Sequence, residues 1–193
     1  MAIVFNLHCY LLLLLLLTLS STFFLHPHNL ASANYSLIDQ QCRQTDAPET
    51  CIGCIMSHPE AAEKADKPED IAAILLTCLS DGAEILKSNF SMLASSVSKD
   101  DIFKGVCEIC SKGYGEAETR LSSAADALKK SDYDEANHML ATALTSSEMI
   151  SCRLNIESYK SEVPKILYLM RIYEELTGAA MSVIDRLPYG EKP

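Results

Sequence analysis

The chain has 193 residues, with 26 acidic and 16 basic side chains, eight cysteines and no tryptophan. Its formal net charge of −10 argues against binding to nucleic acid or acidic polysaccharide, because both are polyanions. The charge favours encounter with a positively charged protein, although it also fits a secreted protein that is only kept soluble by it.

The first 33 residues predict a secretory signal peptide. They contain no Asp, Glu, Lys or Arg and are built around the unbroken run Leu11–Leu17. Polar residues follow, and Ala31-Ser32-Ala33 supplies small residues at a peptidase-type site. We therefore expect cleavage that removes Cys9 and leaves a mature chain from Asn34 without a membrane segment. An uncleaved anchor is the alternative.

The mature stretch of about 160 residues fits one domain with a core of its own. Residues 34–65 contain Pro48, Gly53 and Pro59, which interrupt any helix before it grows long. We expect this segment to form a short N-terminal helical hairpin extension of two or three short helices. A disulfide between Cys42 and Cys51 would close the turn-rich loop between them as a clip.

Residues 66–193 predict four amphipathic helices. The first begins at Asp66-Lys-Pro-Glu69, which offers an N-cap, a proline in the first turn and a capping-box acid. Ser98-Lys-Asp-Asp101 restarts the pattern, and the second helix then carries an apolar stripe from Phe103 to Leu128 at steps of four and three.

The third helix begins at Asp132-Tyr-Asp-Glu135, and the fourth runs from Val163 to Leu187 and ends at Pro188. Four such helices with short connections bury their stripes most simply as an antiparallel up-down-up-down four-helix bundle. The predicted fold class is therefore all-α.

Seven cysteines remain after the signal segment, so at least one thiol is free or forms an intermolecular bond. Two Cys-x-x-Cys pairs, Cys51/Cys54 and Cys107/Cys110, raise the possibility of a metal or redox site. Neither His58 nor His138 lies at ligand spacing from them, and the surroundings are helical. Structural disulfides with buried free thiols are the favoured interpretation, and spacing alone leaves the connectivity open.

An enzyme of its own is the alternative class of function. The chain has no Gly-rich phosphate loop, no nucleophile elbow and no tryptophan for stacking sugars. The acidic pairs Asp100-Asp101 and Glu174-Glu175 are interpreted as solvated helix ends and faces. We predict no catalytic residue, no metal and no cofactor.

Several segments carry a family resemblance when they are taken in order. They are the pair Cys42 and Cys51, the Asp66 helix start, Cys110-Ser-Lys-Gly-Tyr114-Gly-Glu-Ala117-Glu-Thr-Arg-Leu121, Ser131-Asp-Tyr133-Asp-Glu-Ala136, Ala141-Thr-Ala-Leu144, Cys152 and Val183-Ile-Asp-Arg-Leu-Pro188. This order resembles the plant invertase and pectin methylesterase inhibitor family over essentially the whole mature chain.

The resemblance implies a four-helix bundle with an N-terminal extension and two disulfides, Cys42–Cys51 and Cys110–Cys152. The second would join the second bundle helix to the end of the third. Cys54, Cys78 and Cys107 depart from the family's four-cysteine pattern, and their pairing is open. A Cys78–Cys107 bridge would need to span an axial offset of about 15 Å, so both are expected to be packed thiols.

The resemblance also implies a secreted inhibitor that covers the active-site cleft of its target in a one-to-one complex. Pectin methylesterase is the favoured target; the alternatives are cell-wall or vacuolar invertase, and a structural or signalling role without a target enzyme. Some invertase inhibitors carry Pro-Lys-Phe where this chain has Tyr133-Asp134-Glu135. These three residues and Ser151, which precedes the fourth family cysteine, are the candidate target-binding residues, although Ser151 is equally an ordinary loop residue.

The expected location is the apoplast and cell wall, or the vacuole for an invertase inhibitor of that branch. Asn34-Tyr-Ser36 and Asn89-Phe-Ser91 are sequons for N-glycosylation. Asn34 lies close to the expected cleavage point, and the use of Asn89 depends on which helix face it occupies.

Overall fold

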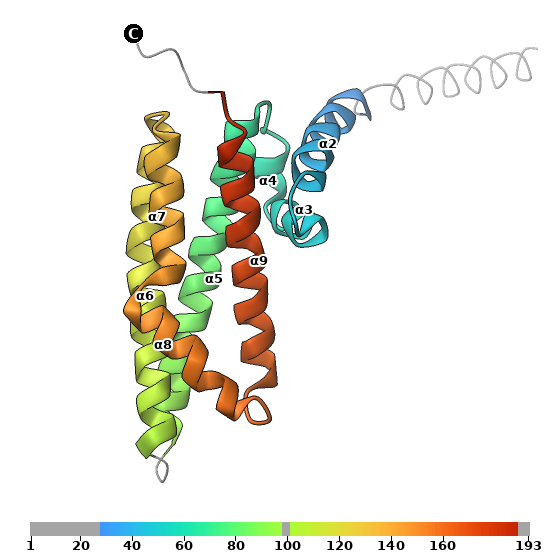
Figure 1. Cartoon of the computed structure of the whole chain (residues 1–193). Helices are drawn as coiled ribbons and strands as arrows, with labels where there is room; N and C mark the ends of the chain where they lie inside the picture. Colours follow the sequence, from blue (N-terminus) through green and yellow to red (C-terminus); the bar gives the residue numbers. More distant parts are fainter. Residues whose placement is uncertain (1–27, 98–100, 189–193) are drawn as a thin grey trace, which may run out of the picture.

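The computed structural model describes residues 28–97 and 101–188, and these residues form helices and no strand (Figure 1). The all-α prediction is confirmed. Residues 1–27 of the predicted signal segment and Ser98–Asp100 of the predicted helix start lie outside the described residues. The elements are α2 (His28–Arg43), α3 (Pro48–Met56), α4 (Pro59–Ala62), α5 (Pro68–Ser96), α6 (Asp101–Lys129), α7 (Tyr133–Thr145), α8 (Ser147–Ile156), the 3-10 turn η1 (Glu157–Tyr159) and α9 (Pro164–Asp185).

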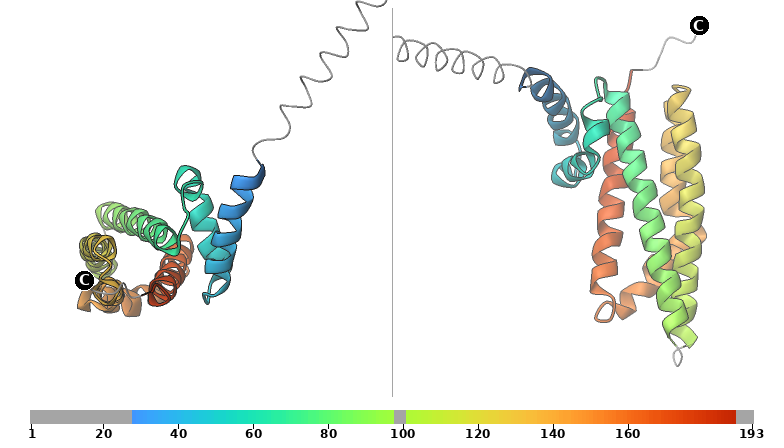
Figure 2. Two further views of the ribbon diagram at one scale, coloured as in Figure 1. Left: turned by 90° about the horizontal axis from the view of Figure 1, so that it is seen from above. Right: turned by 180° about the vertical axis from the view of Figure 1, so that it is seen from behind.

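The long helices run alongside one another with alternating direction. In Figures 1 and 2, α5 descends, α6 returns, α7 and α8 descend together, and α9 returns next to α5. α5 packs against both α6 and α9, and α7 packs against α6 and α9. The helices α2, α3 and α4 lie outside this group on the side of α5 and α9.

The start of α5 lies one residue later than predicted. Pro68 is the first helical residue and Lys67 is the N-cap, in place of Asp66. The carboxylate of Asp70 accepts the backbone N–H groups of Asp66 at 3.1 Å and Lys67 at 3.3 Å. The acid that closes this cap is therefore Asp70, whereas Glu69 accepts a hydrogen bond from Tyr133 at 3.3 Å and links α5 to α7.

Hydrogen bonds end α6 and cap α7 on the two sides of the turn between them. Ser131 adopts a left-handed backbone conformation with φ of 58°, and the N–H of Asp132 donates to the carbonyl of Ala127 at 2.9 Å. This is a Schellman ending for α6. Asp132 also accepts the N–H of Glu135 at 3.3 Å, which confirms the predicted start of α7.

Aromatic rings fill the centre of the bundle. Tyr114 of α6 stacks on Phe90 of α5 with ring centroids 5.9 Å apart, and its edge meets Tyr173 of α9 at 5.4 Å. All three rings are buried. One side chain of the α6 stripe thus contacts the neighbouring helix α5 and also α9, which lies across the bundle, and this links the rotations of α5, α6 and α9.

Three disulfides join the described residues. Cys42–Cys51 closes the α2–α3 hairpin and Cys110–Cys152 joins α6 to α8, and these are the pairings that the family resemblance implies. The third bond is Cys54–Cys78, between α3 and α5, so the prediction that Cys78 is a packed thiol is wrong. Packing of α3 on α5 brings their Cα atoms to 6.1 Å, which helix spacing could not reveal. Cys107 is a buried free thiol, as predicted.

Polar bonds hold the extension to α9. Arg186, just after α9, donates to the carbonyl oxygens of Gln41 at 2.9 Å and Gln44 at 3.2 Å. Thr50 of α3 donates to the carboxylate of Glu175 at 2.6 Å. The extension therefore contacts α9 and the residue that follows it through bonds on both sides of the turn that joins α2 to α3.

Candidate functional site

The third bundle helix is broken, and the break creates a surface feature. Ser146 has an extended backbone, with ψ of 154°, and separates α7 from α8. Its hydroxyl accepts the N–H of Met149 at 3.2 Å, so it is the N-cap of α8. The sequence predicted one continuous helix leading towards Cys152, whereas α8 turns away from α7 towards the foot of α9 (Figure 1).

Contacts with α6 hold α8 in this direction. The Cys110–Cys152 disulfide is buried, and Gly113 lies against the first turn of α8. Lys112 forms an ion pair with Glu148 at 2.7 Å. Hydrogen bonds from Lys112 and then from Ser147 lower the pKa of Glu148 to about 2. The inner side of α8 is therefore fixed.

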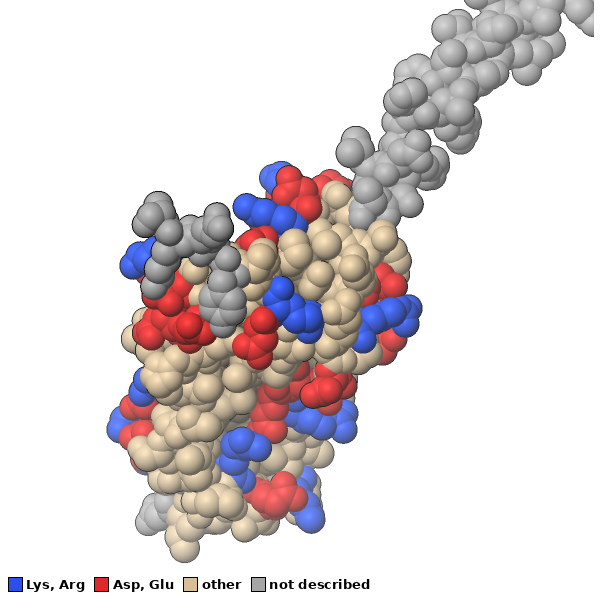
Figure 3. Space-filling model, turned by 45° about the horizontal axis from the view of Figure 1, so that its top comes forward, with Lys and Arg blue, Asp and Glu red and all other residues tan. Residues whose placement is uncertain are grey.

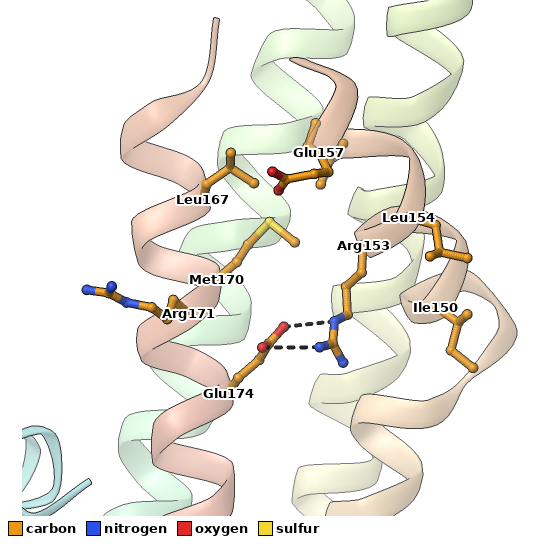
Figure 4. A pocket seen from close by; sticks show the side chains of 9 residues that line it. Ile150, Arg153, Leu154, Glu157, Leu167, Met170, Arg171 and Glu174 are labelled. Atoms are coloured by element: carbon orange, nitrogen blue, oxygen red, sulfur yellow. Dashed lines mark hydrogen bonds and ion pairs between the residues drawn. The ribbon is translucent and has the colours of Figure 1, made fainter. Parts of the chain in front are cut away.

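A groove of about 540 Å³ lies between α8 and α9. Figure 4 shows Leu167 and Met170 projecting into it from α9, while Arg171 points away. The lining residues, which we call the α8–α9 surface, are Ile150, Arg153, Leu154, Ile156, Glu157, Leu167, Met170, Arg171 and Glu174.

An arginine–carboxylate pair spans this groove. The Nε atom of Arg153 lies 2.9 Å from one oxygen of Glu174, and Nη2 donates to the other oxygen at 3.2 Å (Figure 4). Both side chains are partly exposed, at 45% and 33%, so the pair adds little to stability but fixes the orientation of both groups. Arg153 comes from α8 and Glu174 from α9.

Large apolar side chains stand next to this pair. Leu154 is 73% exposed and Ile150 is 46% exposed, one helical turn apart on α8. An exposed apolar group beside an oriented arginine is typical of surfaces that bind another protein. The sequence analysis missed these residues, although a signal existed: Met149, Cys152 and Ile156 form one apolar face of α8, and Ile150 and Leu154 form a second.

The described residues include no group of three or more His, Cys, Asp or Glu side chains placed to hold a metal ion. Within the same residues, no helix is both long enough and apolar enough to span a membrane. Of the acidic pair proposed as a solvated face, Glu174 bonds to Arg153, and Glu175 lies 3.6 Å from Arg171.

Charged side chains are dispersed over one face of the molecule. On the face shown in Figure 3, acidic and basic side chains are intermixed, often side by side, among uncharged residues. The net charge of −10 is therefore not gathered into a single acidic patch on this face. Such a distribution affects long-range encounter more than it defines a contact site.

The predicted target-binding residues do not form one cluster. Tyr133 is buried and packs between α7 and α5, whereas Asp134 and Glu135 are exposed at the start of α7. Ser151 is half-buried on α8, beyond the whole length of α7, which is about 18 Å. Ser151 adjoins Ile150 in the α8–α9 surface, so it is the predicted residue nearest in sequence to the groove lining.

The two sequons lie on helices. The side-chain amide of Asn34 donates to the carbonyl of Glu63, and that of Asn89 donates to the carbonyl of Ile85 at 2.7 Å. In each case the nitrogen that would carry a glycan is engaged in a hydrogen bond. Glycosylation at both positions stays a prediction, which the mass change on glycosidase treatment would test.

Comparison with known sequences decides the family. Residues 36–182, well over half of the chain, match the sequence model of the plant invertase/pectin methylesterase inhibitor family. The chain belongs to this family. A comparison with curated proteins gives no match.

Solved structures agree with the family fold. A mutant form A of a pectin methylesterase inhibitor from Arabidopsis has a TM-score of 0.63 at 19% identity, covering 77% of this chain and 95% of its own. A second structure, of a pectin methylesterase inhibitor from Arabidopsis thaliana, has a TM-score of 0.58 at 18% identity and covers 79% and 97%. At these low sequence identities, the structural similarity shows that this chain and the two inhibitors share a fold.

Proposed function

We propose that the protein is a secreted inhibitor that binds a pectin methylesterase in a one-to-one complex and covers its active-site cleft. Membership of the inhibitor family over residues 36–182 is the observation that carries this proposal. The expected location is the apoplast and cell wall, where such a target acts.

Two features of the chain favour pectin methylesterase over invertase. Asp134 and Glu135 are exposed where some invertase inhibitors of the family carry Pro-Lys-Phe, so the local charge is reversed. The net charge of −10 also suits a basic enzyme, because opposite charges accelerate encounter.

The α8–α9 surface is the part of the molecule that we propose contacts the target. It combines the exposed side chains of Ile150 and Leu154 with the oriented Arg153. Because Cys110–Cys152 and the Lys112–Glu148 pair fix α8, little order needs to be gained on binding. A rigid apolar surface with one arginine matches the composition of binding hot spots.

A titration tests the function. Purified, oxidised residues 34–193 are added to a pectin methylesterase and to an invertase in parallel, at mildly acidic pH and at two salt concentrations. We expect saturating loss of esterase activity at one equivalent, with faster association at low salt. Loss of invertase activity alone would move the protein to the other branch, and no effect on either enzyme would refute the inhibitor function for these targets.

A pair of variants tests the surface. We expect Leu154→Asp to weaken binding at least 10-fold, because a carboxylate would replace an exposed apolar contact at the rim of the groove. Met92→Asp is the matched control, since Met92 is 62% exposed on α5 and lies outside the α8–α9 surface. Equal effects of the two substitutions would place the interface elsewhere.

A further inference from the structure

A histidine lies against the disulfide that the family pattern lacks. The Nδ1 atom of His58, at the start of α4, lies 3.6 Å from the sulfur of Cys78. Its other ring nitrogen, Nε2, lies 3.3 Å from the carboxylate of Asp81, one turn further along α5. Asp81 therefore holds the ring with Nδ1 facing the Cys54–Cys78 bond.

The same disulfide is the one that solvent reaches. Cys54 and Cys78 are each 8% exposed, whereas the four cysteines of the other two disulfides are fully buried. His58 covers part of the bond, and its own side chain is 28% exposed. Among the three disulfides in the described residues, an external thiolate has access to this bond first.

A histidine in this position is suited to assist thiol–disulfide exchange. Thiol–disulfide exchange is faster when the departing sulfur is stabilised as a thiolate, and a protonated imidazole beside it supplies that stabilisation. Nδ1 also lies 3.0 Å from the hydroxyl of Ser57 and 3.4 Å from the carbonyl of Cys54. A thiolate formed at Cys78 would be the strongest of these acceptors, because it carries a full charge.

We propose that Cys54–Cys78 is a thiol-exchange site whose reductant is a dithiol, either a small molecule or a redox protein. The dithiol's thiolate attacks the sulfur of Cys54, a mixed disulfide forms there, and Cys78 leaves as a thiolate that His58 protonates. The reductant's second thiol loses its proton to solvent and attacks the reductant's own sulfur in the mixed disulfide, and Cys54 leaves as a thiolate that takes up a proton from solvent. Cys54 and Cys78 end as thiols, and the reductant ends as a disulfide, so two electrons pass from it to the protein.

The position of the bond gives the exchange a structural consequence. Cys42–Cys51 lies within the extension and Cys110–Cys152 lies within the bundle, whereas Cys54–Cys78 joins α3 to α5. In the described residues it is the one disulfide that cross-links extension and bundle. After its reduction, the α2–α3 hairpin is joined to the bundle by the chain that continues through α4 and by non-covalent contacts such as Thr50 with Glu175.

The order of reduction is the first test. The folded protein is treated with limiting dithiothreitol, free thiols are alkylated at intervals, and peptides are identified by mass spectrometry. We expect Cys54–Cys78 to open at least 10-fold faster than either other disulfide. Opening of Cys42–Cys51 or Cys110–Cys152 at the same rate or earlier would overturn the proposal.

The site of attack is the second test and needs no substitution. With glutathione as a monothiol probe, the mixed disulfide is expected on Cys54, because Cys78 is the sulfur that His58 stabilises. A predominant adduct on Cys78 would refute the role of His58.

A histidine variant separates chemistry from packing. His58→Gln is expected to slow reduction of Cys54–Cys78 about 10-fold, whereas a residue that only shields the bond would, when shortened, let reduction proceed faster. His138→Gln is the control, because His138 is exposed on α7. Unchanged or faster reduction of His58→Gln would contradict the proposal, and the glutathione experiment decides it if that variant does not fold.

Discussion

Gly113 of α6 lies so close to α8 that a Cβ atom at this position would meet the backbone nitrogen of Met149 at 3.2 Å. The same atom would lie 3.3 Å from the carbonyl carbon of Glu148. Both neighbours are backbone atoms, which cannot rotate away as the end of a side chain can. The spacing of α6 and α8 therefore depends on the absence of a side chain at one residue.

Substitution of this glycine should loosen α8. Alanine gains about 1 kcal/mol of helix propensity over glycine, but overpacking against fixed backbone costs about 1–3 kcal/mol. We expect Gly113→Ala to lower the free energy of unfolding by about 1 kcal/mol in urea denaturation. Gly115→Ala is the control on the same helix: its Cβ would lie 3.5 Å from the flexible Lys87 side chain, so it should raise stability. A stabilised Gly113→Ala would disprove the tight contact.

At Ser131, in the turn between α6 and α7, a substitution by glycine should raise stability. A non-glycine residue in the left-handed region costs roughly 1–2 kcal/mol, and Ser131 has φ of 58°. We therefore expect Ser131→Gly to stabilise the protein by about 1 kcal/mol, whereas Ser131→Ala should not. Thermal unfolding measures both, and a loss of stability in the glycine variant would contradict the Schellman ending of α6.

The ion pair that holds α8 predicts a pH dependence. The pKa of Glu148 is lowered from 4.5 to about 2, chiefly by its hydrogen bond from Lys112. Because the folded pKa is the lower one, the pair's stabilising effect is complete above about pH 4.5 and is lost as pH falls towards 2. Carboxyl titration by NMR should show Glu148 ionised at pH 4, and Lys112→Gln should return its pKa towards 4.5.

Lys129→Gln is the control for that titration, because Lys129 pairs with Asp126 and lies on the last turn of α6. It should leave the titration of Glu148 unchanged. An ordinary pKa for Glu148 in the unsubstituted protein would show that the pair with Lys112 is absent in solution.

The free thiol of Cys107 should be inert in the folded protein. Burial, with a smaller contribution from the negative charge of Glu108, raises its pKa to about 11. At pH 8 about one thiol in a thousand would be ionised, and the side chain is fully buried. Iodoacetamide should therefore leave Cys107 unlabelled in the native state and label it in urea. Rapid native labelling would show that α6 opens locally around this residue.

Several features of the fold followed from local patterns. The spacing of Asp132 and Glu135 predicted the start of α7, because an N-cap bond joins residues three apart. The apolar stripe from Phe103 to Leu128 predicted α6, because residues three and four apart lie on the same face of a helix. The break at Ser146 was missed, since a serine inside an apolar pattern marks either a helix interior or a cap, and contacts with α6 decide between them.

The candidate surface was less accessible to sequence reasoning. Ser151 was identified through the family resemblance, but Ile150 and Leu154 were not, because apolar residues on a helix are ordinarily buried. Tyr133 was expected at the surface and lies buried against α5. Exposure depends on which neighbouring element covers a face, and that element can be far away along the chain.

The sequence by itself determined the all-α class, the starts of some bundle helices such as α7, and the inhibitor family, because helical periodicity, capping and ordered motifs act over a few residues. Only the tertiary structure decided that Cys54 pairs with Cys78 while Cys107 stays free, and that α8 leaves a groove beside α9. Cys54 and Cys78 are 24 residues apart on different helices, and they meet because the extension packs on α5. Such contacts follow from how whole helices pack, which no local pattern encodes.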